Sequence, residues 1–165
     1  MDLSTRVYFG KLHPAARIPT KRVEDAGYDL YSVLNHAVCL SPGETRLIPT
    51  GICSSFSSDY VAVVKERGST GSKGLGVRAG IIDSGYRGEW FVALTNHNSR
   101  TLIIAPDDLV LADNVIHYPW SKAIAQFLFL PVPQMEIIEI DAETIQSQVS
   151  ERGTGALGSS GKYRL

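Results

Sequence analysis

The chain has 165 residues, of which 44% are hydrophobic, enough for one domain with a packed core and no covalent cross-link. Its 16 basic and 17 acidic residues give a formal net charge of -1, so no overall basic field is available to hold duplex nucleic acid or an anionic membrane. No stretch approaches the roughly 20 consecutive apolar residues of a membrane span, and residues 1–6 lack the apolar core of a signal peptide. We expect one globular domain, located in the cytoplasm, that binds neither nucleic acid nor membranes.

Short apolar or alternating runs separated by turn residues predict β-strands along most of the chain. These runs occupy residues 7–9, 28–31, 37–40, 46–48, 60–64, 90–95, 124–132 and 135–140. The 15 glycines and 8 prolines fall largely between the runs and leave little room for long helices. Residues 107–114 fit either a short helix or a long loop. The pattern therefore predicts an all-β sandwich or barrel.

The composition changes near the C-terminus. From residue 147 the chain is dense in glycine, serine and charge, with almost nothing apolar to bury. We predict a β-barrel domain over residues 1–146 and a flexible arm over residues 147–165. The composition leaves open whether the arm is an idle terminus or becomes ordered on a ligand or a neighbouring subunit.

The two cysteines, Cys39 and Cys53, lie apart in apolar, strand-like contexts, and the four histidines show no zinc-like spacing to them. Free cysteine commonly packs as a small hydrophobe, so we predict that both are reduced core residues. No transition metal held by the protein is expected.

One candidate phosphate-binding segment follows the strand at residues 60–64. Arg67 can grip a phosphate by two parallel hydrogen bonds, Gly68 lets the main chain approach closely, and Ser69 adds a hydroxyl. The spacing of a Walker A motif is missing. Taken alone, the segment therefore slightly favours the plainer interpretation, a flexible hairpin loop.

Residues 80–88 place a carboxylate, Asp83, at the end of an apolar strand and an aromatic ring, Tyr86, just past a turn. Asp83 has the chemistry to orient or deprotonate a water molecule. A turn-forming aspartate and a half-buried tyrosine are the commoner interpretations when each residue is taken singly.

Three further residues suit a phosphate or metal site. Asp29 opens a strand, and a hydrated Mg²⁺ needs only one or two protein carboxylates when phosphates supply the rest. Gln126 is the one polar amide in a buried strand, and Arg152 lies in the glycine-rich arm. Each also has a plain structural interpretation, as a turn, a strand residue and a disordered tail.

In order and spacing, the five segments that contain Asp29, Arg67, Asp83, Gln126 and Arg152 resemble the five signature motifs of trimeric dUTPases. The resemblance runs from about residue 17 to the C-terminus, and its most specific parts are GIIDSGYRG at residues 80–88 and RGTGALGSSG at residues 152–161. It implies a jelly-roll-like β fold and a homotrimer with active sites between subunits. The implied reaction, assisted by Mg²⁺, is hydrolysis of dUTP to dUMP and pyrophosphate, which keeps uracil out of DNA and supplies dUMP for dTMP synthesis.

The resemblance also implies roles for individual residues. Asp83 would hold the water that attacks the α-phosphorus, Tyr86 would exclude a 2′-hydroxyl, and Asp29 would contact Mg²⁺ through water. Backbone groups of residues 75–80, ending at Gly80, would read uracil. Phosphates would be bound by a set drawn from three motifs: Arg67, Gly68, Ser69, Gln126 and Arg152. Residues of the fifth motif would close over the nucleotide as a lid: Leu157, Gly158, Ser159 and Ser160.

Three positions depart from the family pattern. The serine of the second motif is shifted by one, so its role falls to Ser69, Thr70 or Ser72, of which we predict Ser69. The arginine of the fourth motif is replaced by Ala123, after a longer preceding loop. Leu157 stands where the family has a phenylalanine that stacks on uracil, which is expected to weaken substrate affinity or lid closure.

Two alternatives remain at the level of sequence. A dCTP deaminase shares the fold but needs a glutamate ten residues after the aspartate, where this chain has Ala93. A regulatory binding protein would use nucleotide as a switch and dock a protein partner on the loop at residues 107–122. Tyr118 and Trp120 of that loop favour core packing over docking.

Overall fold

The computed structural model describes residues 6–110 and 112–155. The chain divides into two units: Met1–Pro133, termed the β unit, and Gln134–Leu165, termed the tail unit. The predicted division into a domain over residues 1–146 and an arm over residues 147–165 stays a prediction. None of the described helices is long and apolar enough to cross a membrane.

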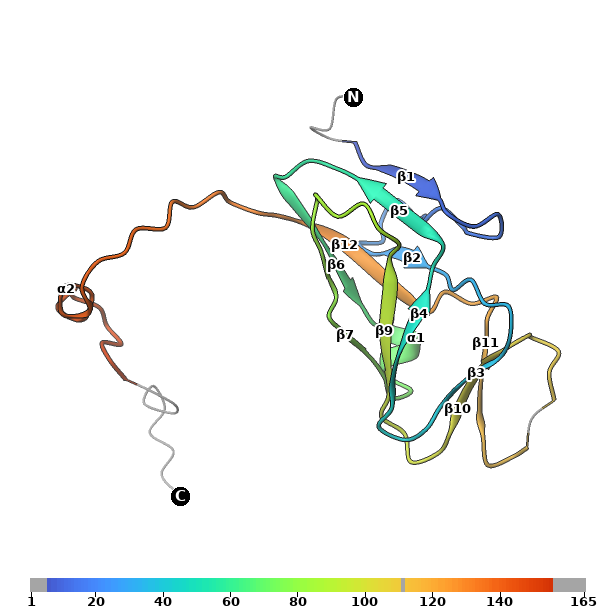
Figure 1. Cartoon of the computed structure of the whole chain (residues 1–165). Helices are drawn as coiled ribbons and strands as arrows, with labels where there is room; N and C mark the ends of the chain where they lie inside the picture. The colour runs from blue at the N-terminus through green and yellow to red at the C-terminus, as the bar shows by residue number, and fades with distance from the viewer. Residues whose placement is uncertain (1–5, 111, 156–165) are drawn as a thin grey trace, which may run out of the picture. The chain divides into compact units, whose positions relative to one another are not determined.

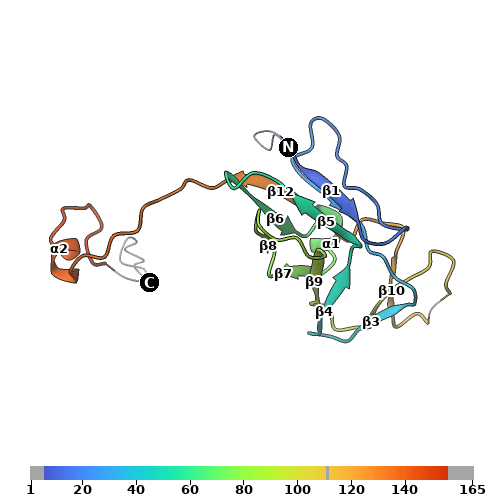
Figure 2. The ribbon, with the colours of Figure 1, turned by 45° about the horizontal axis from the view of Figure 1, so that its top comes forward.

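The described residues of the β unit form four small sheets, and Figure 1 labels most of their strands. The strands β2 (Tyr28–Leu30), β12 (Ala125–Pro131), β6 (Tyr60–Lys65) and β8 (Ile81–Ile82) form the largest, in that order. A second sheet has the order β4 (Thr45–Pro49), β9 (Phe91–Asn96), β7 (Leu75–Arg78). A third has the order β11 (Ile116–Pro119), β10 (Leu102–Ala105), β3 (Val38–Leu40), and β1 (Tyr8–Lys11) pairs with β5 (Ile52–Ser55). Figure 2 shows β1 beside β5 from a second angle.

Aromatic rings fill the centre of the β unit. Trp90 and Phe127 are fully buried, with ring centroids 5.0 Å apart in an edge-to-face arrangement, and Phe9 packs against both. Alternation along β12 sends Phe127 into the core, because successive strand residues point to opposite faces. The all-β prediction is confirmed by this arrangement.

Two predictions about local structure are wrong, the strand at residues 135–140 and the core position of Cys39. Residues 135–140 form no strand, whereas residues 107–110 and 112–114 form turns and loop, which is one of the two alternatives predicted for that stretch. Cys39 is exposed, because its neighbour Leu40 takes the inward-facing position on β3. Both cysteines are free thiols.

Two short helices lie outside the predicted elements. Helix α1 (Gly68–Gly71) is a single turn directly after β6, and α2 (Ala142–Gln146) lies in the tail unit. Asp141 begins α2 by accepting a hydrogen bond from the backbone N–H of Thr144, which is the usual N-cap arrangement. Helix α1 matters for function because it shapes the cavity described next.

Candidate functional site

A cavity of about 650 Å³ opens in the β unit beside the strands β2 and β12. Its walls combine both charge signs with glycines and hydroxyl groups. The lining residues are Thr20, Lys21, Arg22, Asp25, Ala26, Gly27, Asp29, Arg67, Gly68, Ser69, Gln126 and Leu128. Five of the predicted site residues therefore line one cavity: Asp29, Arg67, Gly68, Ser69 and Gln126.

Strand pairing brings these residues together. In the antiparallel registers, Gln126 of β12 lies directly opposite Asp29 of β2 on one side and opposite Lys65 of β6 on the other. Side chains that lie opposite each other in a sheet project from the same face. Gln126 is thus a neighbour of Asp29, although the two are 97 positions apart in the chain. The loop that leaves β6 begins after Lys65, on the other side of Gln126.

Arg67 is held by a carboxylate across the sheet. Its Nε lies 2.8 Å from Oδ1 of Asp29, and its Nη2 lies 3.5 Å from Oδ2 of the same side chain. About a third of each side chain is exposed, so the pair faces the cavity and remains accessible to a ligand. The guanidinium also donates from Nη1 to the backbone carbonyl of Ala123 over 3.5 Å.

Helix α1 determines which hydroxyl faces the cavity. Thr70 is fully buried, and its Oγ1 accepts from the backbone N–H of Arg67 while donating to the carbonyl of the same residue. Ser69 is exposed and lines the cavity, with Oγ 3.4 Å from Nη1 of Arg67. The threonine hydroxyl is therefore occupied by the turn itself, and the geometry favours Ser69 over Thr70 as a phosphate ligand.

Gln126 anchors the loop that carries Arg67. Its Nε2 donates to the carbonyl of Glu66 over 3.0 Å. The amide passes so close to Gly27 that a Cβ added there would lie 2.4 Å from its Oε1. Gly27 is thus required by a long-range contact, and Gln126 supports the phosphate-binding segment as well as lining the cavity.

Glu66 directly precedes Arg67 and carries a carboxyl group with a lowered pKa. A hydrogen bond from its own backbone N–H holds the pKa of the carboxyl below its usual value, and the nearby Lys65 ammonium, 3.6 Å away, contributes in the same direction. Glu66 therefore remains charged, and its carboxylate offsets part of the positive charge beside the cavity.

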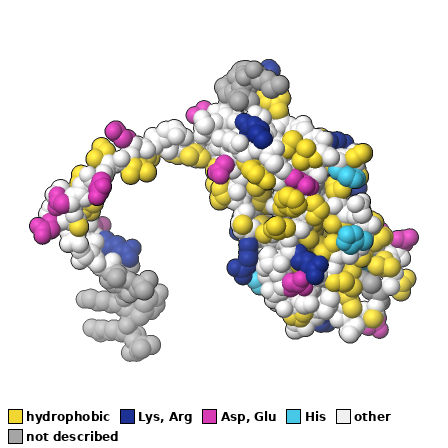
Figure 3. Space-filling model, in the orientation of Figure 1, with side chains coloured by type: hydrophobic (Ala, Val, Ile, Leu, Met, Phe, Trp, Pro, Cys, Tyr) yellow, Lys and Arg dark blue, Asp and Glu magenta, His cyan; other side chains and the backbone are white. Residues whose placement is uncertain are grey.

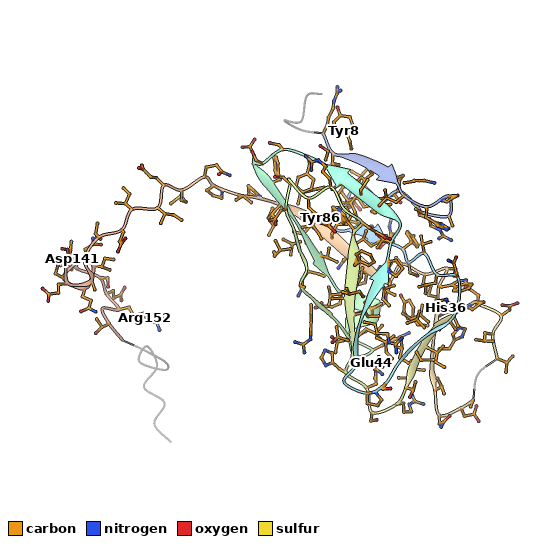
Figure 4. All side chains as sticks on the ribbon, in the orientation of Figure 1. Tyr8, His36, Glu44, Tyr86, Asp141 and Arg152 are labelled. Carbon is orange, nitrogen blue, oxygen red and sulfur yellow. The ribbon has the colours of Figure 1, made fainter. Side chains whose placement is uncertain are left out.

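Asp83 and Tyr86 lie on a different part of the β unit. Asp83 follows β8 and is exposed, and its carbonyl accepts from the backbone N–H of Tyr86 in a tight turn. Tyr86, labelled in Figure 4, is 43% exposed and donates its hydroxyl to the carbonyl of Glu89 over 3.0 Å. Within the described part of the chain, neither residue is among those lining the cavity.

Gly80 is constrained by its neighbours. Its carbonyl accepts from the backbone N–H of Val64 over 2.7 Å, and a Cβ at this position would lie 2.2 Å from the carbonyl oxygen of Val64. The close approach of two backbones excludes any side chain. Gly80 has a structural role whether or not its backbone also reads a base.

The cavity is also lined by Lys21, Arg22 and Asp25, which were not predicted from the sequence. Arg22 pairs with Asp25 over 3.1 Å, and the Lys21 ammonium lies 5.4 Å from the ring centroid of Tyr28. The sequence contained a signal for them, because Lys21 and Arg22 are adjacent cations shortly before the motif that contains Asp29. They increase the cavity's attraction for an anion.

The remaining predicted residues lie in the tail unit. Arg152 is exposed, and its Nε donates to the carbonyl of Gly155 over 3.0 Å. Leu157, Gly158, Ser159 and Ser160 lie outside the described residues.

The loop at residues 107–122 was predicted to pack its aromatic residues into the core. This prediction is confirmed, because Tyr118 is buried and Trp120 packs against the core. This placement gives no support to a docking role for that loop.

The chain is similar to known dUTPases in sequence. A family model described as dUTPase matches residues 13–110. The chain is 37% identical to the deoxyuridine 5'-triphosphate nucleotidohydrolase of Gloeobacter violaceus over 94% of its own length and 97% of that enzyme's. It is 35% identical to the corresponding enzyme of Serratia proteamaculans over 84% of its own length and 82% of that enzyme's.

Solved structures are similar in fold. A mutant dUTPase of Staphylococcus bacteriophage 80alpha, solved with dUpNHpp, has a TM-score of 0.76 and 25% identity over 96% of this chain and 99% of that one. A mutant dUTPase of phage phi11 of S. aureus, with a structural Mg(II) ion, has a TM-score of 0.65 and 25% identity over 82% of this chain and 97% of that one. The predicted jelly-roll-like fold is thereby confirmed.

Proposed function

The chain belongs to the dUTPase family and hydrolyses dUTP to dUMP and pyrophosphate, and we propose that its cavity beside Arg67 holds the triphosphate of that nucleotide. The observation that carries the proposal is that two segments distant in sequence meet at one cavity, the first with Arg67 and Ser69 and the second with Gln126. Arg67 offers a planar fork of donors that matches phosphate oxygens. Ser69 adds a hydroxyl donor at the same wall.

The attacking water is assigned to Asp83. An exposed carboxylate on a hydrogen-bonded turn is able to orient a water molecule and accept its proton when a substrate is placed against it. Tyr86 presents its ring beside the same turn, and its hydroxyl is held by Glu89. In this proposal the ring lies against deoxyribose and leaves no room for a 2′-hydroxyl.

We further propose that the complete site forms between subunits of a homotrimer. Asp83 and Tyr86 do not line the cavity that holds Arg67, although both groups are needed for the reaction. Assembly of copies of the chain would bring Asp83 of one subunit to the phosphates held by another. Arg152 and the lid residues that follow it would then close over the nucleotide, excluding water from the phosphates.

A hydrated Mg²⁺ fits the donor set of the cavity. Asp29 is a carboxylate that lines the cavity, but its oxygens already face Arg67, which suits contact through water better than direct coordination. Among residues 6–110 and 112–155 no cluster of three or more His, Cys, Asp or Glu side chains is arranged to hold a metal ion. When bound with the nucleotide, the ion would offset charge on the triphosphate.

The proposal is tested by measuring pyrophosphate release from dUTP, dTTP, dCTP and UTP in the presence of Mg²⁺. We expect release from dUTP alone. The other nucleotides differ from dUTP in base or sugar, so the assay examines base, sugar and reaction together. Equal release from UTP would contradict the role of Tyr86. Ammonia from dCTP without pyrophosphate from dUTP would indicate a deaminase instead.

The location of the protein in the cytoplasm stays a prediction.

Chelation tests the metal assignment separately. Removing Mg²⁺ with EDTA is expected to lower kcat/KM by about a hundredfold, since a bound ion contributes several kcal/mol of charge stabilisation. Circular dichroism should remain unchanged, because the described residues contain no protein-only metal cage that supports the fold. Full turnover in EDTA would contradict the assignment of Asp29.

A further inference from the structure

Tyr118 lies directly behind the phosphate-binding segment. It belongs to β11, pairs with Ile104 of β10 in a parallel register, and is only 8% exposed. Its hydroxyl donates to the backbone carbonyl of Ala123 over 2.6 Å, which is a short and buried hydrogen bond. The described cavity lining does not include Tyr118, so its hydroxyl acts from behind the wall.

The carbonyl of Ala123 is shared with Arg67. Nη1 of Arg67 reaches the same oxygen at 3.5 Å, a length at which a hydrogen bond is weak. The same nitrogen lies 3.4 Å from Oγ of Ser69, on the cavity side. Nε and Nη2 of the guanidinium are directed to Asp29. Nη1 is therefore the donor that is not directed to Asp29, and its contacts with Ala123 and Ser69 are both long.

The electrostatic surroundings keep Tyr118 a neutral donor. Burial raises the pKa of its phenol, and the Arg67 guanidinium beside it opposes part of that rise. A neutral phenol keeps its O–H and can therefore donate a hydrogen bond to the Ala123 carbonyl. The contact from Tyr118 is 2.6 Å long, whereas that from Arg67 is 3.5 Å and weak.

We propose that Tyr118 is a positioning residue for Arg67: by satisfying the Ala123 carbonyl, its hydroxyl leaves Nη1 of Arg67 free to bind the substrate triphosphate. This inference rests on the proposed function, because it assumes that Arg67 binds phosphate. Without the hydroxyl, the buried carbonyl requires another donor, since an unsatisfied buried acceptor is costly. Nη1 of Arg67 already lies 3.5 Å from this oxygen, and turning toward it would draw Nη1 away from the cavity.

The test is Tyr118→Phe in the full-length protein. The ring is kept, so the variant is expected to fold, which thermal unfolding checks. KM for dUTP should rise about tenfold, the equivalent of one lost charge-assisted hydrogen bond, while kcat stays within about twofold. Tyr118→Leu removes the same hydroxyl and is measured in its place if the first variant does not fold.

Two inhibitors separate phosphate binding from general disturbance of the site. Inorganic tripolyphosphate carries the phosphates alone, and deoxyuridine carries the base and sugar alone. In Tyr118→Phe the Ki of tripolyphosphate should rise by the same factor as KM, and the Ki of deoxyuridine should not change. Equal losses for both inhibitors would indicate a structural role and overturn the inference.

Thr50→Val is the matched control. The Thr50 hydroxyl is buried and donates to the carbonyl of Trp90 over 2.6 Å, so the substitution removes a comparable hydrogen bond that does not involve Arg67. KM should stay at the wild-type value. A tenfold rise in this variant would show that loss of any buried hydroxyl disturbs binding, which would also overturn the inference.

Arg67→Lys completes a double-mutant cycle. If Tyr118 acts through Arg67, Tyr118→Phe has no further effect on KM in the Arg67→Lys background. Additive effects would overturn the inference. An unchanged KM in Arg67→Lys would overturn the proposed phosphate role of Arg67 itself. A raised KM in Arg67→Lys together with an unchanged KM in Tyr118→Phe would overturn the inference alone.

Discussion

The two aspartates of the predicted site lie in different surroundings, and each is therefore suited to a different role. Asp29 is tied to Arg67 by a 2.8 Å ion pair, so it orients the guanidinium at the cavity wall. Asp83 is exposed on its turn, which leaves its carboxylate available for water. Both were predicted as chemical residues from motif resemblance, whereas the ion pair could not be predicted, because it joins strands that are distant in sequence.

Asp83→Asn is expected to lower kcat by about a hundredfold or more, because the amide cannot accept the proton of the attacking water. KM should change little, since Asp83 does not line the phosphate cavity. Pyrophosphate release measures both constants. Asp108→Asn replaces another exposed aspartate of the β unit and should retain wild-type turnover. A normal kcat in Asp83→Asn would remove the residue from the mechanism.

At the scale of elements, strands were predicted correctly where an apolar run lies between turn residues and pairs with another strand of the same chain. Runs at residues 60–64 and 124–132 became β6 and β12, which pair with each other. Residues 135–140 also have a partly apolar pattern but form no strand, because periodicity records side-chain preference and says nothing about an available partner. Helix α1 was missed because its turn depends on the buried Thr70 hydroxyl.

The junction of β8 and β6 tolerates no side chain at Gly80. Gly80→Ala places a Cβ 2.2 Å from a backbone oxygen, so β8 must move from β6 and the hydrogen bond from Val64 to Gly80 is strained. We expect the free energy of unfolding to fall by about 2 to 4 kcal/mol, from overpacking and a weakened backbone bond. Urea unfolding measures the change.

Gly85→Ala is the matched control for this substitution. The position lies five residues along the same segment and has open space around it, with no heavy atom within 4 Å of the added Cβ. Its stability should lie within about 0.5 kcal/mol of the wild type. Equal losses in the two variants would contradict the steric explanation at Gly80.

For the whole molecule, the tail unit is the part least explained by a single chain. Met135, Ile137 and Ile138 are 80%, 96% and 68% exposed, and Figure 3 shows apolar side chains along this segment. Exposed apolar residues of this kind are typical of a surface that contacts a partner, and in the predicted homotrimer we expect another subunit to contact them. Motif resemblance predicted the trimer, but no pattern in the β unit alone identifies which faces meet.

The lid assignment is tested by ending the chain after Ser150, which removes Arg152 and the fifth motif. The described fold of the β unit contains none of these residues, so the protein should remain folded and trimeric by sedimentation. Turnover should fall steeply, because the γ-phosphate loses its arginine and water reaches the site. Removing only residues 162–165 shortens the same arm beyond the motif and should preserve turnover. Undiminished turnover after the longer truncation, or a monomer, would contradict the assignment of the arm as a lid.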